Sequence, residues 1–206
     1  MSTILVTGYE PFGEHETNPS ARIAHDIDTE TINGCSIIGR ELPVVFDEAL
    51  PLLIEEIENH DPAIILSTGL MPEREVLSVE RIGINVRDAE DIPDNADRSP
   101  IDVPVEKDGP AAYFSTLPIR KLVSRSKDAG VPARISNTAG THLCNNLLYA
   151  TRHYIEMTDH DIASGFAHVP FSHEQVARRE ETAPSMSYDA MRAGVRAMVD
   201  HLAETI

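Results

Sequence analysis

Two short, continuously apolar runs, each ending at a glycine, constrain the fold most strongly. Residues 3–7 (TILVT) stop at Gly8, and residues 63–68 (AIILST) stop at Gly69. Such uninterrupted, β-branched runs are typical of strands that are buried on both faces of a sheet. A sheet buried on both faces needs helices above and below it, so these two runs already favour an α/β fold.

Segments with helical spacing alternate with further strand-like runs. Asn18-Pro19 has the pattern of an N-cap followed by a first-turn proline, and it predicts a helix to about Asp28. Residues 46–59 (FDEALPLLIEEIEN) have apolar side chains at helical spacing and stop before Asp61-Pro62. The same reading predicts extended segments at 35–42, 77–86, 134–136 and 162–169, and helices at 118–129, 144–156 and 188–204, with one more after Gly109-Pro110.

The length and evenness of the chain indicate a single domain. The 206 residues suffice for one core, and no internal repeat or low-complexity tract divides them. We therefore expect residues 1–206 to form one domain. Its predicted architecture is a three-layer sandwich with a twisted, mostly parallel central sheet and helices on both faces.

Charge and composition exclude several functional classes. The formal net charge is −17, with 14 Arg and 3 Lys, so the surface field repels nucleic-acid backbones and anionic membranes. An acidic, lysine-poor surface also suits a salt-rich cytoplasm, in which screening removes the self-repulsion. No apolar run approaches the roughly 20 residues of a membrane span, and no basic leader is visible. With only Cys35 and Cys144, a disulfide framework is excluded, and we expect a cytoplasmic protein.

Three polar side chains in otherwise apolar surroundings are candidates for catalysis. Cys144 follows a predicted strand and begins a predicted helix, His168 closes the strand from residue 162, and Glu80 interrupts an apolar run. A thiol hydrolase uses such groups: the imidazole lowers the thiol pKa and relays its proton, and the carboxylate orients the imidazole. The helix N-terminus would favour a thiolate and bind an oxyanion. Packing offers another interpretation, because buried cysteines and satisfied structural histidines are common and Glu80 could pair with Arg81 or Arg87.

A family resemblance decides between these interpretations. The chain resembles the pyrrolidone-carboxylate peptidases (pyroglutamyl peptidase I), cysteine peptidases that remove N-terminal pyroglutamate. The segments that carry the resemblance occur in family order: VTGYEPFGEHETNPS (6–20), STGLMPER (67–74), SVERIGINVRDAEDIPDN (78–95), DGPAAYFSTLPI (108–119), SNTAGTHLCNNLLYA (136–150), GFAHVPF (165–171) and PSM (184–186). The resemblance implies a triad of Glu80, Cys144 and His168, no metal or cofactor, peptides with N-terminal pyroglutamate as substrates, and a homo-oligomer, a tetramer or a dimer.

The resemblance also implies where the substrate lies. Pyroglutamate is an uncharged lactam, so its pocket needs flat apolar walls and a few backbone hydrogen bonds. The aromatics of the loop after the first strand, Tyr9 and Phe12, are expected as walls. Tyr9 stands where the family usually has Phe, so its hydroxyl needs a partner. The backbone at Gly69, Leu70 and Met71 is expected to bind the lactam.

Several positions depart from the family pattern around this expected site. His142 and Leu143 stand where the family usually has an aromatic facing the lactam, and a histidine wall is titratable. Met71, Pro72 and Glu73 replace a glycine-rich segment. Glu90 and Asp91 replace an arginine, with one residue added, and an acid beside a thiolate opposes its ionisation. These changes leave a second hypothesis open: a catalytically weakened relative that binds pyroglutamyl-like small ligands.

Other kinds of site find little support. The chain has no G-x-S-x-G serine motif and no Walker loop, and TGYEPFG does not match the dinucleotide fingerprint. The histidines form no short-range ligand pair with a cysteine, so we expect no metal site. A nucleoside phosphorylase is a remote third possibility by fold analogy, but no arginine cluster in a glycine-rich loop supports it. Cys35 lies in the apolar run GCSIIG, and we expect it to be buried and inert.

Overall fold

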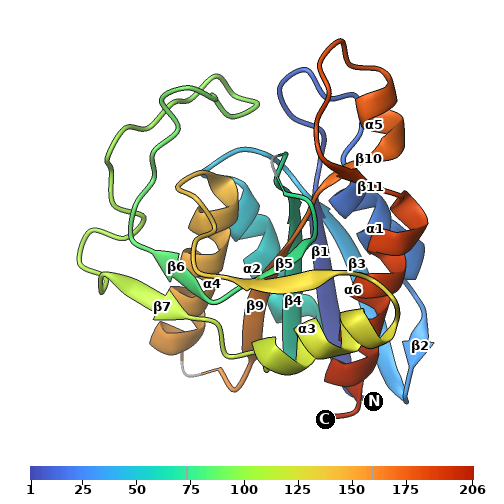
Figure 1. The fold of residues 1–206 in the computed structure, drawn as a ribbon. Coiled ribbons are helices and arrows are strands. Elements are labelled where there is room, and N and C mark those ends of the chain that lie inside the picture. The colour runs from blue at the N-terminus through green and yellow to red at the C-terminus, as the bar shows by residue number, and fades with distance from the viewer. Residues whose placement is uncertain (73, 159) are drawn as a thin grey trace.

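A seven-stranded central sheet organises the molecule (Figure 1). The computed structural model describes residues 1–72, 74–158 and 160–206. The strand order is β2-β3-β1-β4-β9-β5-β8. The strands of this sheet are β1 (Thr3–Tyr9), β2 (Thr31–Ile32), β3 (Cys35–Leu42), β4 (Ile64–Leu70), β5 (Leu77–Glu80), β8 (Ala133–Ser136) and β9 (Ala163–Val169). The pairings β1–β3, β1–β4, β4–β9 and β5–β8 are parallel, whereas β2–β3 and β5–β9 are antiparallel. The prediction of a mostly parallel sheet is confirmed.

Helices cover both faces of this sheet and give three layers. They are α1 (Pro19–Ile27), α2 (Ala49–His60), α3 (Ile119–Asp128), α4 (Leu143–Thr158), α5 (His173–Ala177) and α6 (Tyr188–Ala203). One hydrophobic cluster joins α1, α3 and α6 to the sheet, with Ile23, Leu122 and Val195 among its fully buried members. A second cluster joins α2 and α4 to the other face, with Leu53 and Leu147 fully buried. The three-layer α/β fold expected from the sequence is therefore present.

The first α/β unit forms as its sequence predicts. The Asn18 side chain accepts a hydrogen bond from the Ser20 backbone N–H at 3.0 Å, and Pro19 occupies the first turn of α1. This helix passes very close to β1, because a Cβ added at Gly8 would lie 2.1 Å from the Ser20 carbonyl oxygen. Only glycine permits that approach, so the glycine that ends the apolar run also fixes where the helix packs.

One predicted helix boundary and one predicted helix are wrong for identifiable reasons. Helix α2 begins at Ala49 and not at Phe46. Residues 46–48 form a turn in which the N–H groups of Glu48 and Ala49 both donate to the Val45 carbonyl at 3.1 Å, and the Phe46 N–H donates to the Asp94 side chain at 3.0 Å. The segment after Gly109-Pro110 is not a helix. Residues Ala112–Phe114 form β7, which pairs antiparallel with β6 (Ile82–Ile84). Long-range pairing overrides the local helix-start signal there, and the predicted single strand at 77–86 is divided into β5 and β6.

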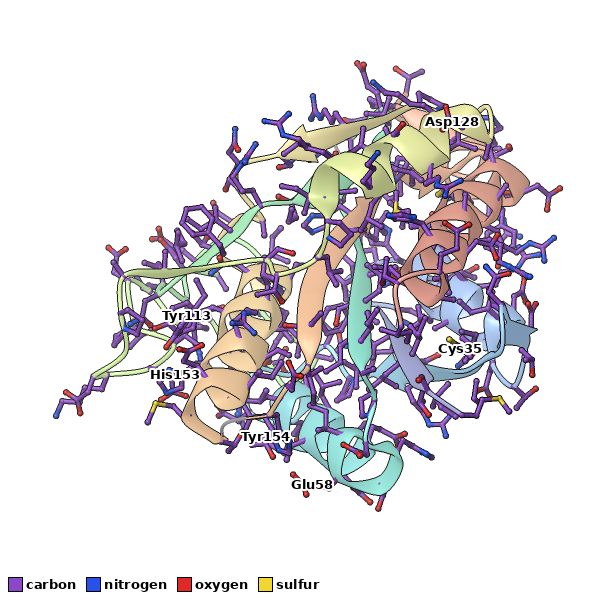
Figure 2. All side chains as sticks on the ribbon, turned by 90° about the horizontal axis from the view of Figure 1, so that it is seen from below. Cys35, Glu58, Tyr113, Asp128, His153 and Tyr154 are labelled. Carbon is purple, nitrogen blue, oxygen red and sulfur yellow. The ribbon has the colours of Figure 1, made fainter. Side chains whose placement is uncertain are left out.

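Side-chain hydrogen bonds fasten these peripheral elements to α4. The Tyr113 hydroxyl of β7 lies 3.0 Å from Nδ1 of His153, and the Tyr154 hydroxyl donates to Glu58 of α2 at 2.6 Å (Figure 2). A further two-stranded sheet, β10 (Phe171–Ser172) with β11 (Ser185–Met186), lies beside α5 (Figure 1). The bonds of His153 and Tyr154 hold the later turns of α4 against β7 and α2.

Candidate active site

Glu80 and His168 form a fully buried pair. Oε1 of Glu80 lies 2.8 Å from Nδ1 of His168, and both residues are 0 % exposed. The two strands that carry them run antiparallel, with Glu80 opposite Phe166 and Ser78 opposite His168. Opposed residues share a face of a sheet, and so do residues two apart. The carboxylate and the imidazole therefore meet on the face that α4 covers.

The geometry fixes which nitrogen of His168 is available for chemistry. A carboxylate only accepts hydrogen bonds, so Nδ1 carries the proton and donates it to Glu80. The Nε2 atom is then an acceptor, and it is buried without a hydrogen-bond partner among the described residues. A buried acceptor left free at one end and oriented by a carboxylate at the other can accept a proton from a neighbouring group.

The Cys144 thiol lies against Gly69, the residue of β4 that pairs with His168. Cys144 is the second residue of α4, and a Cβ added at Gly69 would lie 2.8 Å from its Sγ atom. Gly69 is the register partner of His168 in the β4–β9 pair. Residues paired across strands are neighbours on the same face. The thiol therefore lies over the sheet at the level of His168, and Gly69 leaves the room for it.

Burial dominates the ionisation of this thiol. Burial first, and the negative charge of Glu80 second, raise the pKa of the Cys144 thiol to about 12, while a backbone hydrogen bond at Cys144 itself lowers it. The expectation that the helix N-terminus and the imidazole would give a low thiol pKa is therefore wrong for this conformation. Loss of solvation outweighs the helix terminus, and the resting site holds a neutral thiol. Its proton has to leave during the reaction.

The strand directions correct one further expectation. In a wholly parallel sheet, Cys144, which follows one strand, and His168, which closes another, would lie at the same edge. Strand β8, which precedes Cys144, instead runs opposite to β9, and its last residue Ser136 lies opposite Glu80. The chain between Ser136 and Leu143 then carries the thiol back over the sheet. The residues meet, but along a face and not at a single edge.

Two of the expected wall residues, Tyr9 and Leu143, are buried at the start of α4 and contact each other there. Tyr9 is 2 % exposed, and its hydroxyl donates to the Leu143 carbonyl at 3.0 Å. Burial first, and the neighbouring Cys144 second, raise the pKa of Tyr9 well above its ordinary value, so the hydroxyl keeps its proton. The partner that this hydroxyl needs is thus a backbone group beside the thiol. The Leu143 side chain is itself buried, in the cluster beneath α4.

The remaining expected pocket residues are Phe12, and Leu70 and Met71 at the end of β4. Phe12 is partly buried and packs against the same cluster, with its ring edge-to-face to His15 at 5.2 Å. Leu70 is buried and ends β4. The Met71 N–H donates to the Val169 carbonyl at 2.9 Å, and the Met71 carbonyl accepts from the backbone N–H of Arg74 at 3.1 Å. The N–H and the carbonyl of Met71 are therefore already hydrogen bonded within the protein.

His142 is partly buried just before α4 and contacts a loop that is distant in sequence. Its ring is edge-to-face to Phe46 at a centroid distance of 5.2 Å, and Nε2 lies 2.9 Å from the Ile92 carbonyl. Burial lowers the pKa of His142 below its ordinary value, partly offset by the hydrogen bond to Ile92 and by the charge of Asp94. The ring therefore stays neutral at neutral pH, which suits a wall for an uncharged ligand.

The two acids that depart from the family pattern lie in the same loop. Glu90 and Asp91 are both exposed to solvent. The loop that carries them is joined to the segment before Cys144 by two bonds between Asp88 and Thr141, at 3.0 and 2.8 Å. The acid whose charge raises the thiol pKa is nevertheless Glu80 and not these two. Glu73, the third acidic departure, lies outside the described residues.

Sequence reasoning missed two residues that shape the site. The Asn145 side chain accepts from the Ile84 N–H at 2.8 Å and donates to the carbonyls of Ile84 and Val86 at 2.9 Å, which fixes the first turn of α4 on β6. Arg74 approaches Glu80, with Nη2 3.9 Å from Oε1. The signal for Asn145 was a polar pair inside an apolar helix, CNN. Nothing local could show the partner of Arg74.

The described residues contain no group of three or more His, Cys, Asp or Glu side chains placed to hold a metal ion. Both cysteines there are free thiols, Cys35 buried and Cys144 partly so. In the same part of the chain, no helix is both long and apolar enough to cross a membrane.

An α/β sheet that carries a thiol at a helix start beside a buried imidazole–carboxylate pair has the architecture of a thiol hydrolase. The chain belongs to the pyroglutamyl peptidase family, whose model matches residues 2–205. It is 42% identical to a pyrrolidone-carboxylate peptidase of Escherichia fergusonii, over 97% of this chain and 92% of that protein. It is 44% identical to one of Streptomyces coelicolor, over 100% of this chain and 94% of the relative.

A solved structure extends the similarity to three dimensions. The fold superposes on the crystal structure of pyrrolidone carboxyl peptidase from the hyperthermophile Pyrococcus furiosus with a TM-score of 0.95 and 40% identity, covering 98% of this chain and 99% of the other. The family expected from the sequence segments is thereby confirmed, and so is its mostly parallel α/β fold. This chain is a cysteine peptidase of that family.

Proposed function

We propose that this protein releases N-terminal pyroglutamate from peptides, with Cys144 as nucleophile, His168 as proton carrier and Glu80 as the group that orients His168. One observation carries the proposal: the thiol lies against the register partner of a buried histidine whose Nε2 is free and whose Nδ1 is bound to a carboxylate. The names of the relatives, pyrrolidone-carboxylate peptidases, supply the substrate class.

The acylation step follows from this placement. Sγ of Cys144 attacks the carbonyl carbon of the amide that joins pyroglutamate to the next residue. As it does so, the thiol proton passes to Nε2 of His168, and Glu80 stabilises the resulting imidazolium. The Asn146 N–H is the first in α4 to bond within the helix, to the His142 carbonyl at 3.0 Å. The N–H groups before it are the donors we assign to the developing oxyanion. The imidazolium then gives its proton to the leaving amine, which departs as the shortened peptide.

The deacylation step uses the same groups in reverse. The thioester between Cys144 and the pyroglutamyl group is attacked by water, whose proton passes to Nε2 of His168. Collapse of the tetrahedral intermediate breaks the carbon–sulfur bond, and the proton returns to the sulfur. Pyroglutamic acid leaves and the neutral thiol is restored. The high pKa of Cys144 suits a cycle that starts and ends with a protonated thiol.

Recognition of the lactam is proposed for the apolar surroundings of the thiol. Phe12 and His142 are only partly buried and can present ring faces, whereas Tyr9 and Leu143 act from behind by holding the start of α4. The backbone of Leu70, the last residue of β4, is proposed to hydrogen bond to the lactam. An uncharged five-membered ring needs no ionic anchor.

The proposal extends to organisation and location. Residues 1–206 are taken to act as one peptidase domain, because the two largest hydrophobic clusters pack on a single sheet. A cytoplasmic homo-oligomer is the expected form, in line with the family resemblance and with two free thiols. Sedimentation at working concentration measures the oligomeric state directly.

A fluorogenic pyroglutamyl amide tests the function, at low and at high salt because the chain is strongly acidic. Release of the fluorophore by the wild-type protein, and its absence with Cys144→Ser, is the expected result. Release of fluorophore from an unblocked glutamyl amide at a similar rate would contradict the substrate class. Saturable binding of the pyroglutamyl amide without turnover would instead support the alternative, a ligand-binding relative on a peptidase scaffold.

A further inference from the structure

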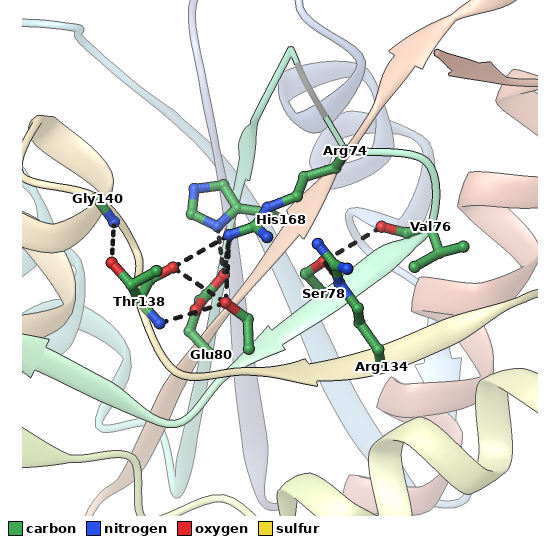
Figure 3. A network of polar contacts seen from close by, with 9 residues as sticks. Arg74, Val76, Ser78, Glu80, Arg134, Thr138, Gly140 and His168 are labelled. Carbon is green, nitrogen blue, oxygen red and sulfur yellow. Dashed lines mark hydrogen bonds and ion pairs between the residues drawn. The ribbon is translucent and has the colours of Figure 1, made fainter.

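We propose that Arg74 is a positioning residue of this site: it holds the Glu80 carboxylate in its charged form and joins it to the segment that leads to Cys144. The catalytic part of this inference rests on the proposed function. Arg74 belongs to the segment between β4 and β5, and its side chain is 17% exposed, while that of Glu80 is 0% exposed. Figure 3 shows its guanidinium between His168 and the strand that carries Glu80.

The contacts of Arg74 place one cation against a buried anion. Nη2 lies 3.9 Å from Oε1 of Glu80, the same oxygen that accepts from His168 at 2.8 Å. Nη2 also donates to Oγ of Ser136 and to the Thr138 carbonyl, each at 3.2 Å. These two bonds fix the guanidinium, so its position does not depend on the longer contact with the carboxylate.

Charge balance around Glu80 explains why such a cation is needed. A carboxylate removed from water is strongly destabilised unless it is paired, so burial alone favours its neutral form. The charged and titratable groups that face it are Arg74 from the β4–β5 segment, His168 from β9 and Cys144 from α4. Neither His168 nor Cys144 carries a permanent positive charge. Among the described residues, Arg74 is therefore the permanent cation in contact with Glu80.

The same side chain connects the carboxylate to the approach of the nucleophile. Ser136 is the register partner of Glu80 in the β5–β8 pair, and its hydroxyl donates to the Thr138 carbonyl at 3.0 Å. Thr138 in turn accepts at its side chain from the Gly140 N–H at 3.1 Å (Figure 3). A continuous set of hydrogen bonds thus runs from Arg74 to within three residues of α4. Loss of Arg74 would disturb both the charge of Glu80 and this set.

Arg134 offers a matched control on the neighbouring strand. Its Nε donates to Oγ of Ser78 at 3.4 Å, and Ser78 is the antiparallel partner of His168. It is an arginine on the same face, one strand away, and within the described residues it makes no contact with Glu80. A general effect of removing an arginine from this part of the sheet would appear in both variants.

The test compares Arg74→Met, Arg74→Lys and Arg134→Met with the wild type in the pyroglutamyl amide assay across pH. In Arg74→Met we expect kcat to fall roughly 10-fold or more with little change in KM, because the change acts through the carboxylate and not on the substrate. The acid limb of kcat should move up by about one pH unit, the smallest effect usual for an adjacent arginine. Arg74→Lys keeps the charge and should restore most of the limb, and Arg134→Met should match the wild type.

A second measurement does not depend on the substrate. The Nδ1 proton shared by His168 and Glu80 should give a downfield proton resonance, assigned by its loss in His168→Ala. On acidification it should disappear at higher pH in Arg74→Met than in the wild type. If the wild type fails to cleave the amide but this shift occurs, the proposed function fails and the positioning role stands.

Other outcomes overturn the inference itself. An unchanged resonance and an unchanged acid limb in Arg74→Met show that Arg74 does not support the carboxylate. Equal losses in Arg74→Met and Arg134→Met show an effect on the sheet alone. If Arg74→Met does not fold, as judged by circular dichroism, Arg74→Lys decides: an acid limb displaced as far as one pH unit despite the retained charge contradicts the role.

Discussion

Nδ1 of His168 and Oε1 of Glu80 lie 2.8 Å apart in a position with no exposed surface on either residue. This contact leaves one function for each group. The carboxylate fixes the tautomer and the ring orientation, and the free Nε2 handles the proton. Because the two residues are 88 positions apart in sequence, only the antiparallel β5–β9 pairing brings them together.

Removing the imidazole should therefore reduce turnover far more than removing its orienting carboxylate. We expect His168→Ala to lower kcat on the order of 10³-fold or more, and Glu80→Gln to lower it by less, since a glutamine keeps one acceptor for Nδ1. Steady-state rates on the pyroglutamyl amide measure both. Small and equal losses would show that the roles are wrongly assigned.

The two cysteines should separate chemistry from packing. Cys144→Ala should abolish turnover, because nothing else at the start of α4 can form the thioester. Cys35 is 3% exposed in the other hydrophobic cluster, so Cys35→Ala should keep full activity. Its vacated volume should reduce the free energy of unfolding by about 1 kcal/mol in urea titrations. More than a few per cent of wild-type turnover in Cys144→Ala would refute the nucleophile.

A single methyl group at Gly69 should displace the thiol. The added Cβ would lie 2.8 Å from Sγ of Cys144 and 2.9 Å from the Phe166 ring, so one of them has to move. We expect Gly69→Ala to lower kcat at least ~10-fold, with a stability loss of about 1–3 kcal/mol.

Gly165→Ala is the matched control, because its added Cβ would meet Ser115 and Leu117 in the segment between β7 and α3 and not the thiol. It should lose stability but keep the kcat of the folded fraction. Wild-type kcat in Gly69→Ala would mean that the thiol does not depend on this space.

Local patterns in the sequence predicted most of the fold. The apolar runs at β1 and β4 and the cap at Asn18 act within a few residues, so periodicity and turn chemistry suffice to find them. The failure after Gly109-Pro110 has the opposite cause. There the Asn85 N–H donates to the Ala111 carbonyl at 3.0 Å, and the Tyr149 hydroxyl donates to the Pro110 carbonyl at 2.7 Å. These partners lie tens of residues away, and they hold the segment extended.

The residues of the site also separate into those that local sequence predicts and those that depend on long-range packing. Cys144, His168 and Glu80 could be named because each is a polar group in an apolar context and because the segments around them resemble a known family. The ionisation of the thiol could not be foreseen, since it depends on how deeply α4 packs and on the distance to Glu80. Nor could the position of Arg74, whose carboxylate and carbonyl partners come from separate strands and loops.

The remaining prediction concerns His142 and the pH dependence of stability, whose direction follows from the burial of this side chain. In the folded protein the pKa of His142 is below the ordinary value of 6.5, with desolvation as the main cause. The unfolded chain therefore binds a proton more readily than the folded one between those two values. The stability that neutral His142 contributes is fully present above about pH 6.5 and is lost as pH falls through the folded pKa.

His142→Phe removes that titration and offers a flat apolar ring in the same place. The free energy of unfolding from urea titrations should fall less between pH 7.5 and pH 5 in the variant than in the wild type. A residual slope remains, because burial and Arg179 also lower the pKa of His15, which is present in both proteins. The variant loses the hydrogen bond to the Ile92 carbonyl, so at pH 7.5 its stability should be slightly lower, by about 1 kcal/mol.

The same substitution tests the wall for the lactam. A protonated ring beside an uncharged ligand has to be desolvated, so in the wild type KM should rise at acid pH, and His142→Phe should lower KM and flatten that rise. Because burial lowers the pKa of His142, the rise should begin below pH 6.5. The acid limb of kcat depends on the groups at Cys144 and His168, and it should persist in the variant. If KM and its acid limb are unchanged while the stability slope flattens, residue 142 packs on Phe46 without facing the substrate. The lactam wall would then have to lie on the Phe12 side of the pocket.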